Sequence, residues 1–166
     1  VPPEWVAAPV YLNSNHLSII GPEDEAIWPH GARRMDYELE WAMITGRTGS
    51  NITAATAADH IFGYTIFNDI SARDIQGING DEWSRGNSGM MDHRFEGVLE
   101  HLSQNQTVYA GEVFGSGTVP TGCGLEHNRY LEDGDEIELD VEGIGVLTTK
   151  IVKPADWRDR KKPDQN

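Results

Sequence analysis

The chain has 166 residues, of which 38% are hydrophobic, so it is long and apolar enough for one globular core. Its formal net charge of −14 excludes a nucleic-acid groove and a surface for anionic membranes, because phosphate would be repelled. No apolar run approaches the roughly 20 residues of a membrane span, and the one cysteine, Cys123, excludes an internal disulfide framework, so we expect a cytoplasmic protein.

The first half of the chain predicts two strands on either side of a short helix. Residues 1–35 are irregular and contain several prolines. Residues 36–45 begin with alternation and end apolar, which predicts a strand that enters the core. Residues 53–62 predict a short helix, and the β-branched and aromatic run 64–68 predicts a second strand. Residues 69–76 are polar and predict a turn of helix.

The second half predicts one longer helix followed by strands. Apolar residues at helical spacing over 93–103 predict a helix with one buried face. Residues 112–118 predict a strand, and residues 137–152 predict another that two glycines bend. The charged residues from 156 to 166 predict a frayed tail. Because neither a repeat nor a linker divides the chain, we expect one domain over residues 1–166, of mixed α+β class and mainly β.

Two glutamates on the first predicted strand are the first candidates for a site. Glu38 and Glu40 are two residues apart, so both carboxylates project from the same face. Such a face is either solvated at a sheet edge or neutralised by a cation, since burying unpaired carboxylates is costly. Asp69, directly after the strand 64–68, is a candidate third ligand for a hard cation, although an Asp there also suits a helix cap. The residues alone leave both interpretations open.

Three phrases of the sequence point to one protein family. They are DYELE at 36–40, NDISARDIQ at 68–76 and GSGTVPTGCGLE at 115–126. Together with LEDGDEIELDVEGIGVL at 131–147, they resemble the fumarylacetoacetate hydrolase family in the order of its motifs. The resemblance runs from about residue 15 to about residue 152. It implies the family's mainly β architecture, a β-roll or sandwich with a few short helices, and a homodimer.

The resemblance also implies a metal and a substrate. By position, the family's metal ligands correspond to Glu38, Glu40 and Asp69, and the expected ion is Mg²⁺ or Mn²⁺, with Ca²⁺ as a further candidate. None of the six histidines has the spacing of a zinc site. The expected substrate is a small 1,3-dioxo or 2-oxo acid, which can chelate a divalent cation through two oxygens.

Four further residues correspond to family positions that contact substrate or water. Arg73 and Gln76 correspond to the pair that holds the oxo-acid group, Thr118 to a substrate contact, and Glu126 to the glutamate of a water-activating acid–base pair. An arginine offers a planar fork that matches a carboxylate, and a glutamate near a basic partner can draw a proton from water. From the residues alone, Arg73 could instead form a surface ion pair worth under about 1 kcal/mol, and Glu126 could be a solvated strand-end residue.

The implied reaction is hydrolysis of a carbon–carbon bond in an acylpyruvate or a fumarylacetoacetate-like compound, as in aromatic catabolism. The same enolate chemistry also serves 2-oxo acid decarboxylases, isomerases and dehydratases. A relative that binds metal or a small acid without catalysis is the alternative from another class.

The sequence departs from the family pattern in two places. The family's further aspartate ligand and its acid–base histidine belong before residue 1, and a segment with a strand and a substrate-contacting lysine belongs between Gln76 and Gly77. Two explanations are open: the sequence joins the ordered parts of a longer protein, or the chain is a shortened relative that keeps the metal site. We expect the first, because deleting an internal strand would leave an open sheet edge.

Overall fold

The computed structural model describes residues 8–9, 11, 13–73 and 91–159. The chain divides into two compact units. Unit 1 comprises the described residues within Val1–Ile19, Trp41–Thr65 and Asn87–Gly117, and unit 2 comprises those within Ile20–Glu40, Ile66–Gly86 and Thr118–Asn166. The described residues form mainly strands, with one α-helix and short 3₁₀ turns, as the sequence predicts.

The strands of unit 1 are organised around β3. Strand β3 (Leu39–Thr45) lies between β5 (Ile61–Asn68) and β8 (Val113–Gly115) in a sheet, and it pairs antiparallel with β8. A second, two-stranded sheet joins β4 (Gly49–Ser50) to β7 (Thr107–Val108). Two 3₁₀ turns, η1 (His16–Ser18) and η2 (Ala57–His60), complete this unit.

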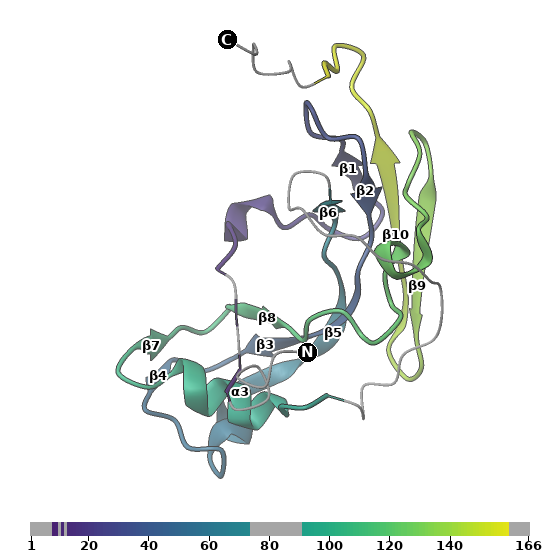
Figure 1. Ribbon diagram of the computed structural model, residues 1–166. Coiled ribbons are helices and arrows are strands. Elements are labelled where there is room, and N and C mark those ends of the chain that lie inside the picture. The colour runs from purple at the N-terminus through teal and green to yellow at the C-terminus, as the bar shows by residue number, and fades with distance from the viewer. Residues whose placement is uncertain (1–7, 10, 12, 74–90, 160–166) are drawn as a thin grey trace. The chain divides into compact units, whose positions relative to one another are not determined.

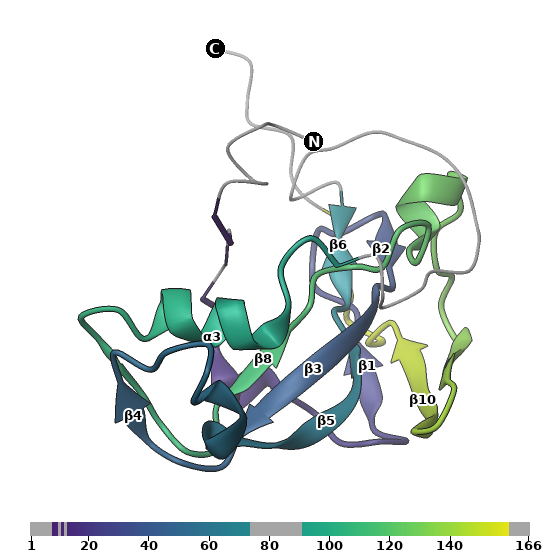
Figure 2. The ribbon, with the colours of Figure 1, turned by 90° about the horizontal axis from the view of Figure 1, so that it is seen from below.

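Helix α3 (Phe95–Leu102) supplies the core of unit 1. Its buried residues Phe95, Leu99 and Leu102 pack with Met43 of β3 in one apolar cluster. These three positions repeat at helical spacing, which is why the sequence predicts both the helix and its buried face. Figure 2 shows the helix lying along β3 and β8.

Unit 2 is built on a hairpin of two long strands. Strands β9 (Glu136–Val141) and β10 (Gly145–Val152) pair antiparallel, and β1 (Glu25–Ile27) adds parallel to β10 (Figure 1). Ile137 and Leu139 of β9 point into a core that Ile66 completes, and Glu138 between them is exposed. A short antiparallel pair joins β2 (Met35–Asp36) to β6 (Ser71–Ala72), and the 3₁₀ turn η4 spans Gly124–His127.

The structure corrects two of the predicted strand and helix assignments. Residues 137–152 form a hairpin and not one bent strand, because Gly143 and Gly145 have φ values of 82° and 133° that favour glycine and reverse the chain. Within the predicted helix 53–62, only η2 forms, and the last two residues begin β5. The strand predicted over 64–68 therefore begins earlier, at Ile61, because β-branched and aromatic side chains such as those of Ile61 and Phe62 pack better on a sheet.

Three smaller corrections concern the segments between the main elements. Residues 1–35 were expected to be irregular, but β1 forms there. Residues 71–72 form strand β6 where a turn of helix was predicted, and residues 74–76 lie outside the described residues. The strand predicted over 112–118 is limited to β8.

The described end of the chain, up to residue 159, is anchored where a frayed tail was predicted. The indole Nε1 of Trp157 donates a hydrogen bond to the Pro29 carbonyl oxygen at 2.9 Å. The ammonium of Lys153 lies 4.2 Å from the ring centre of Trp28 and 4.5 Å from that of Trp157. These cation–π contacts within unit 2 stabilise the segment that carries Lys153 and Trp157. Its charge and proline content alone predict fraying.

Candidate functional site

The three predicted metal ligands lie together in unit 2. Oxygen atoms of Glu38, Glu40 and Asp69 are all within 4.8 Å of one another. The end of β5 brings Asp69 beside the first glutamate, because the Asp69 N–H donates to the Glu38 carbonyl oxygen at 3.2 Å. The N–H of Leu39, between the two glutamates, donates to the Gly122 carbonyl oxygen at 2.9 Å. We call these three residues the carboxylate cluster.

The carboxylate cluster is not a solvated edge. Strand β3 lies between two other strands, and Glu40 is only 5% exposed. Although Asp69 is exposed as a whole residue, desolvation of its carboxyl group raises its pKa, and the nearby charge of Glu38 raises this pKa further. Such like charges are stabilised by a cation, and an all-oxygen donor set suits a hard divalent ion. The residues present therefore fit Mg²⁺, Mn²⁺ or Ca²⁺.

Arg73 lies beside the carboxylate cluster as a buried cation. It is 8% exposed; its Nε donates to Asp36 Oδ2 at 2.7 Å, and its Nη2 forms an ion pair with Glu38 Oε1. Burial alone would lower the pKa of Arg73, but the hydrogen bonds and charges of the two carboxylates outweigh burial and raise it. The surface-pair interpretation of Arg73 is therefore wrong, and the guanidinium already has two carboxylate partners.

Asp36 is the residue of this site that the sequence analysis did not single out. It is fully buried at 0% exposure, and its two oxygens accept four hydrogen bonds. Three come from backbone N–H groups, of Tyr37 at 2.9 Å, Gly124 at 2.7 Å and Leu125 at 2.9 Å, and the fourth comes from Arg73. An aspartate at the start of the predicted strand 36–45 has no periodic signal, so only its position in the DYELE phrase could have indicated it.

Glu126 lies on η4, which starts at the Asp36 carboxylate. The thiol of Cys123 lies 3.5 Å from Glu126 Oε2 and donates to it, and Cys123 forms a β-bridge with Glu38. Glu126 is partly buried on a 3₁₀ turn, so it is not a solvated strand-end residue. The structure therefore places Glu126 on a turn that begins beside the carboxylate cluster.

Thr118 lies in the loop between β8 and η4 and is partly buried. Its neighbour Val119 donates a backbone hydrogen bond to the Leu39 carbonyl oxygen at 3.0 Å, so the loop runs beside the segment that carries Glu38 and Glu40. Gln76 lies outside the described residues.

The close approach of η4 to Asp36 requires glycine at position 124. A Cβ atom there would lie 2.5 Å from Asp36 Oδ1 and would also collide with the Arg129 carbonyl oxygen. We expect Gly124→Ala to lower the free energy of unfolding by about 1–3 kcal/mol, because the backbone must shift. Urea denaturation measures this, and Gly97→Ala, where an added Cβ meets nothing within 4 Å, is the control. Equal stability of the two variants would contradict the close contact.

Cys123 makes the stability of the protein depend on pH in the alkaline range. Burial raises the pKa of its thiol from the ordinary 9.0 to about 11; a hydrogen bond with Glu126 opposes this effect, and the charge of Asp36 adds to it. The folded state therefore holds the thiol proton more tightly than the unfolded state. This stabilisation is complete below about pH 9 and is lost as the pH rises through about 11.

We expect this loss to reach about 2–3 kcal/mol in wild type and to be smaller in Cys123→Ala. Urea denaturation at a series of pH values between about 8 and 11 measures it. The same pH dependence in both proteins would contradict the role of Cys123.

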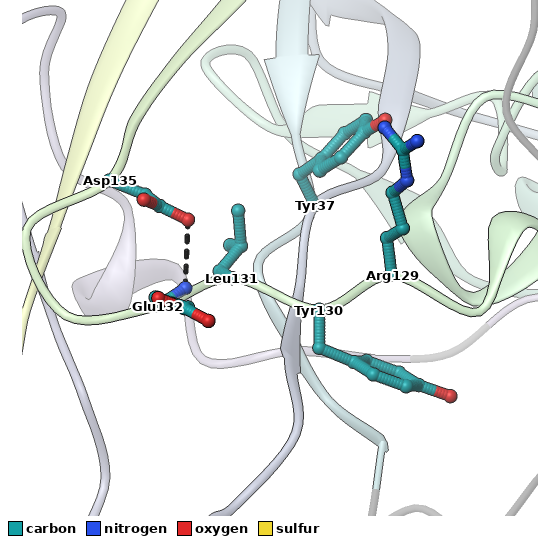
Figure 3. A pocket seen from close by; sticks show the side chains of 6 residues that line it. All are labelled: Tyr37, Arg129, Tyr130, Leu131, Glu132 and Asp135. Carbon is teal, nitrogen blue, oxygen red and sulfur yellow. Dashed lines mark hydrogen bonds between the residues drawn. The ribbon is translucent and has the colours of Figure 1, made fainter.

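A separate pocket of about 460 Å³ lies in unit 2, and the carboxylate cluster does not line it. Its lining residues are Tyr37, Arg129, Tyr130, Leu131, Glu132 and Asp135. In Figure 3 the side chains of Tyr37 and Arg129 lie next to each other, and that of Tyr130 points away from them. Burial, followed by the charge of Asp36, raises the pKa of Tyr37 to about 12. We place the candidate site at the carboxylate cluster, because among the described residues it is there that carboxylates converge as a set of metal ligands.

Sequence comparison establishes the class of protein. The chain matches the family described as fumarylacetoacetate (FAA) hydrolase C-terminal over residues 1–78 and 77–152. It therefore belongs to this family, as its motifs predict. Among solved structures, it is similar to 5-carboxymethyl-2-hydroxymuconate delta-isomerase from Mycobacterium smegmatis, with a TM-score of 0.77, 29% identity and coverage of 90% of this chain and 72% of that one. This similarity confirms the predicted fold class.

Several relatives carry names that differ in activity. Human mitochondrial oxaloacetate tautomerase FAHD2A is 28% identical over 186 residues, covering 87% of this chain and 59% of that protein. Protein Rv2993c of Mycobacterium tuberculosis is 30% identical over 185 residues, covering 89% of this chain and 68% of that protein. Fumarylacetoacetate hydrolase from Exiguobacterium antarcticum has a TM-score of 0.70 and 29% identity, with coverage of 82% and 64%.

The chain spans 59% of the length of the human relative. Because 87% of 166 residues is about 144, about 42 of the 186 aligned positions have no residue of this chain. The family match divides at residues 77–78. This is also where the motifs indicate that a segment of the family is missing, between Gln76 and Gly77. No helix among the described residues is long and apolar enough to cross a membrane.

Proposed function

We propose that this protein is a divalent-metal-dependent hydrolase that cleaves a carbon–carbon bond in an acylpyruvate or a fumarylacetoacetate-like acid. The observation that carries the proposal is the convergence of Glu38, Glu40 and Asp69 beside the buried cation Arg73. Membership of the family supports a small oxo acid as the substrate class. The acidity of the chain does not oppose an anionic substrate, because a metal and an arginine offset the negative charge locally.

In this proposal Glu38, Glu40 and Asp69 hold the cation, Mg²⁺ or Mn²⁺ with Ca²⁺ as a further candidate. The bound ion would supply Lewis-acid stabilisation for negative charge that develops on the substrate's carbonyl oxygens. Arg73 places a fixed positive charge beside Glu38 and favours the binding of an anionic substrate.

The remaining predicted residues act on water and on the substrate. Glu126 takes a proton from water, which then attacks the carbonyl carbon next to the bond that breaks. The thiol of Cys123 donates to its carboxylate and fixes its orientation. Thr118 offers a hydroxyl to the substrate, and Gln76 pairs with Arg73 in holding the oxo-acid group.

A second candidate reaction is enol–keto tautomerisation or isomerisation of an oxo acid. The similarity to a human oxaloacetate tautomerase and to a mycobacterial isomerase supports it. This reaction also proceeds through an enolate, but it needs no attacking water. Decarboxylation, dehydration and binding without catalysis are further candidates.

One experiment separates these reactions. Wild type and Glu126→Gln are incubated with an acylpyruvate and with enol-oxaloacetate, each with Mn²⁺ or with EDTA, and products are identified by NMR. A hydrolase releases pyruvate from the acylpyruvate only with metal, and Glu126→Gln loses this reaction. Conversion of enol-oxaloacetate to its keto form faster than without protein, and without cleavage, identifies a tautomerase. Conversion of both substrates at the rates observed without protein, under every condition, contradicts an enzymatic role.

We also propose that the protein is a cytoplasmic homodimer, as its family resemblance implies. Two large side chains on the same face of β5, Phe62 and Tyr64, are 79% and 42% exposed and offer surface that a second copy can cover. Light scattering during size exclusion gives twice the mass of one chain for a dimer. The mass of one chain contradicts this proposal.

A further inference from the structure

We propose that Asp36 is a positioning residue of this site, which holds Arg73 as the counter-ion of Glu38 and fixes the turn that carries Glu126. Its effect on the metal rests on the proposed function. Its effect on Arg73 does not, because the contacts involved need no metal.

Three segments of unit 2 meet at the Asp36 carboxylate. Asp36 lies on β2, Arg73 directly follows β6, and Gly124 begins η4. Strands β2 and β6 pair with Asp36 opposite Ser71, and the Arg73 N–H donates to the Arg34 carbonyl oxygen at 2.9 Å. The backbone therefore delivers the guanidinium to Asp36, and the carboxylate determines where it points.

The Asp36 carboxylate also fixes the orientation of the guanidinium. Asp36 Oδ2 binds Nε of Arg73 at 2.7 Å, so the terminal Nη2 is directed to Glu38. A guanidinium is planar and its donors are fixed relative to one another, so holding Nε holds Nη2 as well. Without an acceptor at Nε, Arg73 would keep only the ion pair with Glu38.

Asp36 also sets the charge of the site. Asp36, Arg73 and Glu38 together carry one net negative charge. An asparagine at position 36 removes that negative charge, so the site attracts a divalent cation less strongly even though Arg73 keeps its ion pair with Glu38. The amide nitrogen of the asparagine would also face a donor, because both oxygens of Asp36 accept hydrogen bonds from N–H groups.

Calorimetric titration of Mn²⁺ into metal-free wild type, Asp36→Asn and Asp36→Asn/Arg73→Gln tests this role. We expect Asp36→Asn to bind Mn²⁺ at least about 10-fold more weakly. The double variant removes one negative and one positive charge, so it should recover most of the lost affinity for Mn²⁺. Asp135→Asn is the control, because Asp135 is exposed and accepts a backbone hydrogen bond from Glu132 at 2.8 Å in the same unit. Unchanged affinity in Asp36→Asn, or a double variant as weak as the single one, overturns the proposal.

A metal-independent measurement accompanies the titration. In EDTA, the shift in Tm caused by Glu38→Gln is measured in wild type and in Asp36→Asn. If Asp36 directs Arg73 onto Glu38, the two shifts differ by more than about 2 °C. Equal shifts overturn the positioning role. If wild type binds no Mn²⁺, the proposed function fails, and this comparison alone decides the role of Asp36.

Discussion

Replacement of Arg73 by alanine is expected to lower the free energy of unfolding by about 3–5 kcal/mol, because the fully buried Asp36 and the partly buried Glu38 lose their cation. Three backbone N–H groups would still bind Asp36, but they carry no compensating charge. Urea denaturation at neutral pH measures the change. A protein with only marginal stability would unfold, and Arg73→Lys, which keeps a charge but not the planar fork, should then be intermediate.

The chain offers a matched control for this prediction. Arg33 forms an ion pair with Asp159 at 2.7 Å, which is the same length as the contact between Arg73 and Asp36, but both side chains are about half exposed, at 55% and 52%. Arg33→Ala should therefore cost under about 1 kcal/mol. If the two variants lose the same stability, the burial of Arg73 is not what makes its ion pairs important.

The second large effect is expected from Asp69→Asn. The substitution removes one ligand of the proposed metal site, so metal-dependent turnover of an oxo acid should fall by about 100- to 1000-fold. The metal-free protein should not be destabilised, because desolvation and the charge of Glu38 already disfavour the ionised Asp69 carboxylate. Loss of activity without loss of stability separates a metal ligand from a residue that only supports the fold.

Initial rates with saturating Mn²⁺ and Tm values in EDTA measure the two effects. Asp59→Asn is the control, since Asp59 is an exposed aspartate on η2 in unit 1. A lower Tm for metal-free Asp69→Asn together with unchanged turnover would assign Asp69 to the fold and not to the site.

Local patterns in the sequence predict much of this fold. The spacing of Phe95, Leu99 and Leu102 identifies α3, and alternation identifies β3, which carries Glu40 and begins directly after Glu38. The hairpin of β9 and β10 was not predicted, because a pair of glycines in an apolar run is compatible with a bulge as well as with a reversal. The anchored residues near Trp157 depend on partners more than a hundred positions earlier, which local composition does not reveal.

The site was predicted to a different degree for different residues. The spacing of Glu38 and Glu40 placed two carboxylates on one face, and the motif added Asp69; the structure brings all three together. The burial of Arg73 and the hydrogen bonds that converge on Asp36 were not predicted. Arg73 and Gly124, which donate to Asp36, are 37 and 88 positions away from it along the chain. Hydrogen bonds of that kind leave no periodic pattern in one sequence.

The central claim is that the carboxylate cluster is a divalent metal site, and a calorimetric titration of Mn²⁺ into the metal-free protein tests it most directly. The comparison is with the double variant Glu38→Gln/Glu40→Gln, which keeps the size of both side chains and removes both charges. We predict binding at one site in wild type that the double variant loses. Absence of binding in wild type, or equal binding in both proteins, would contradict the claim.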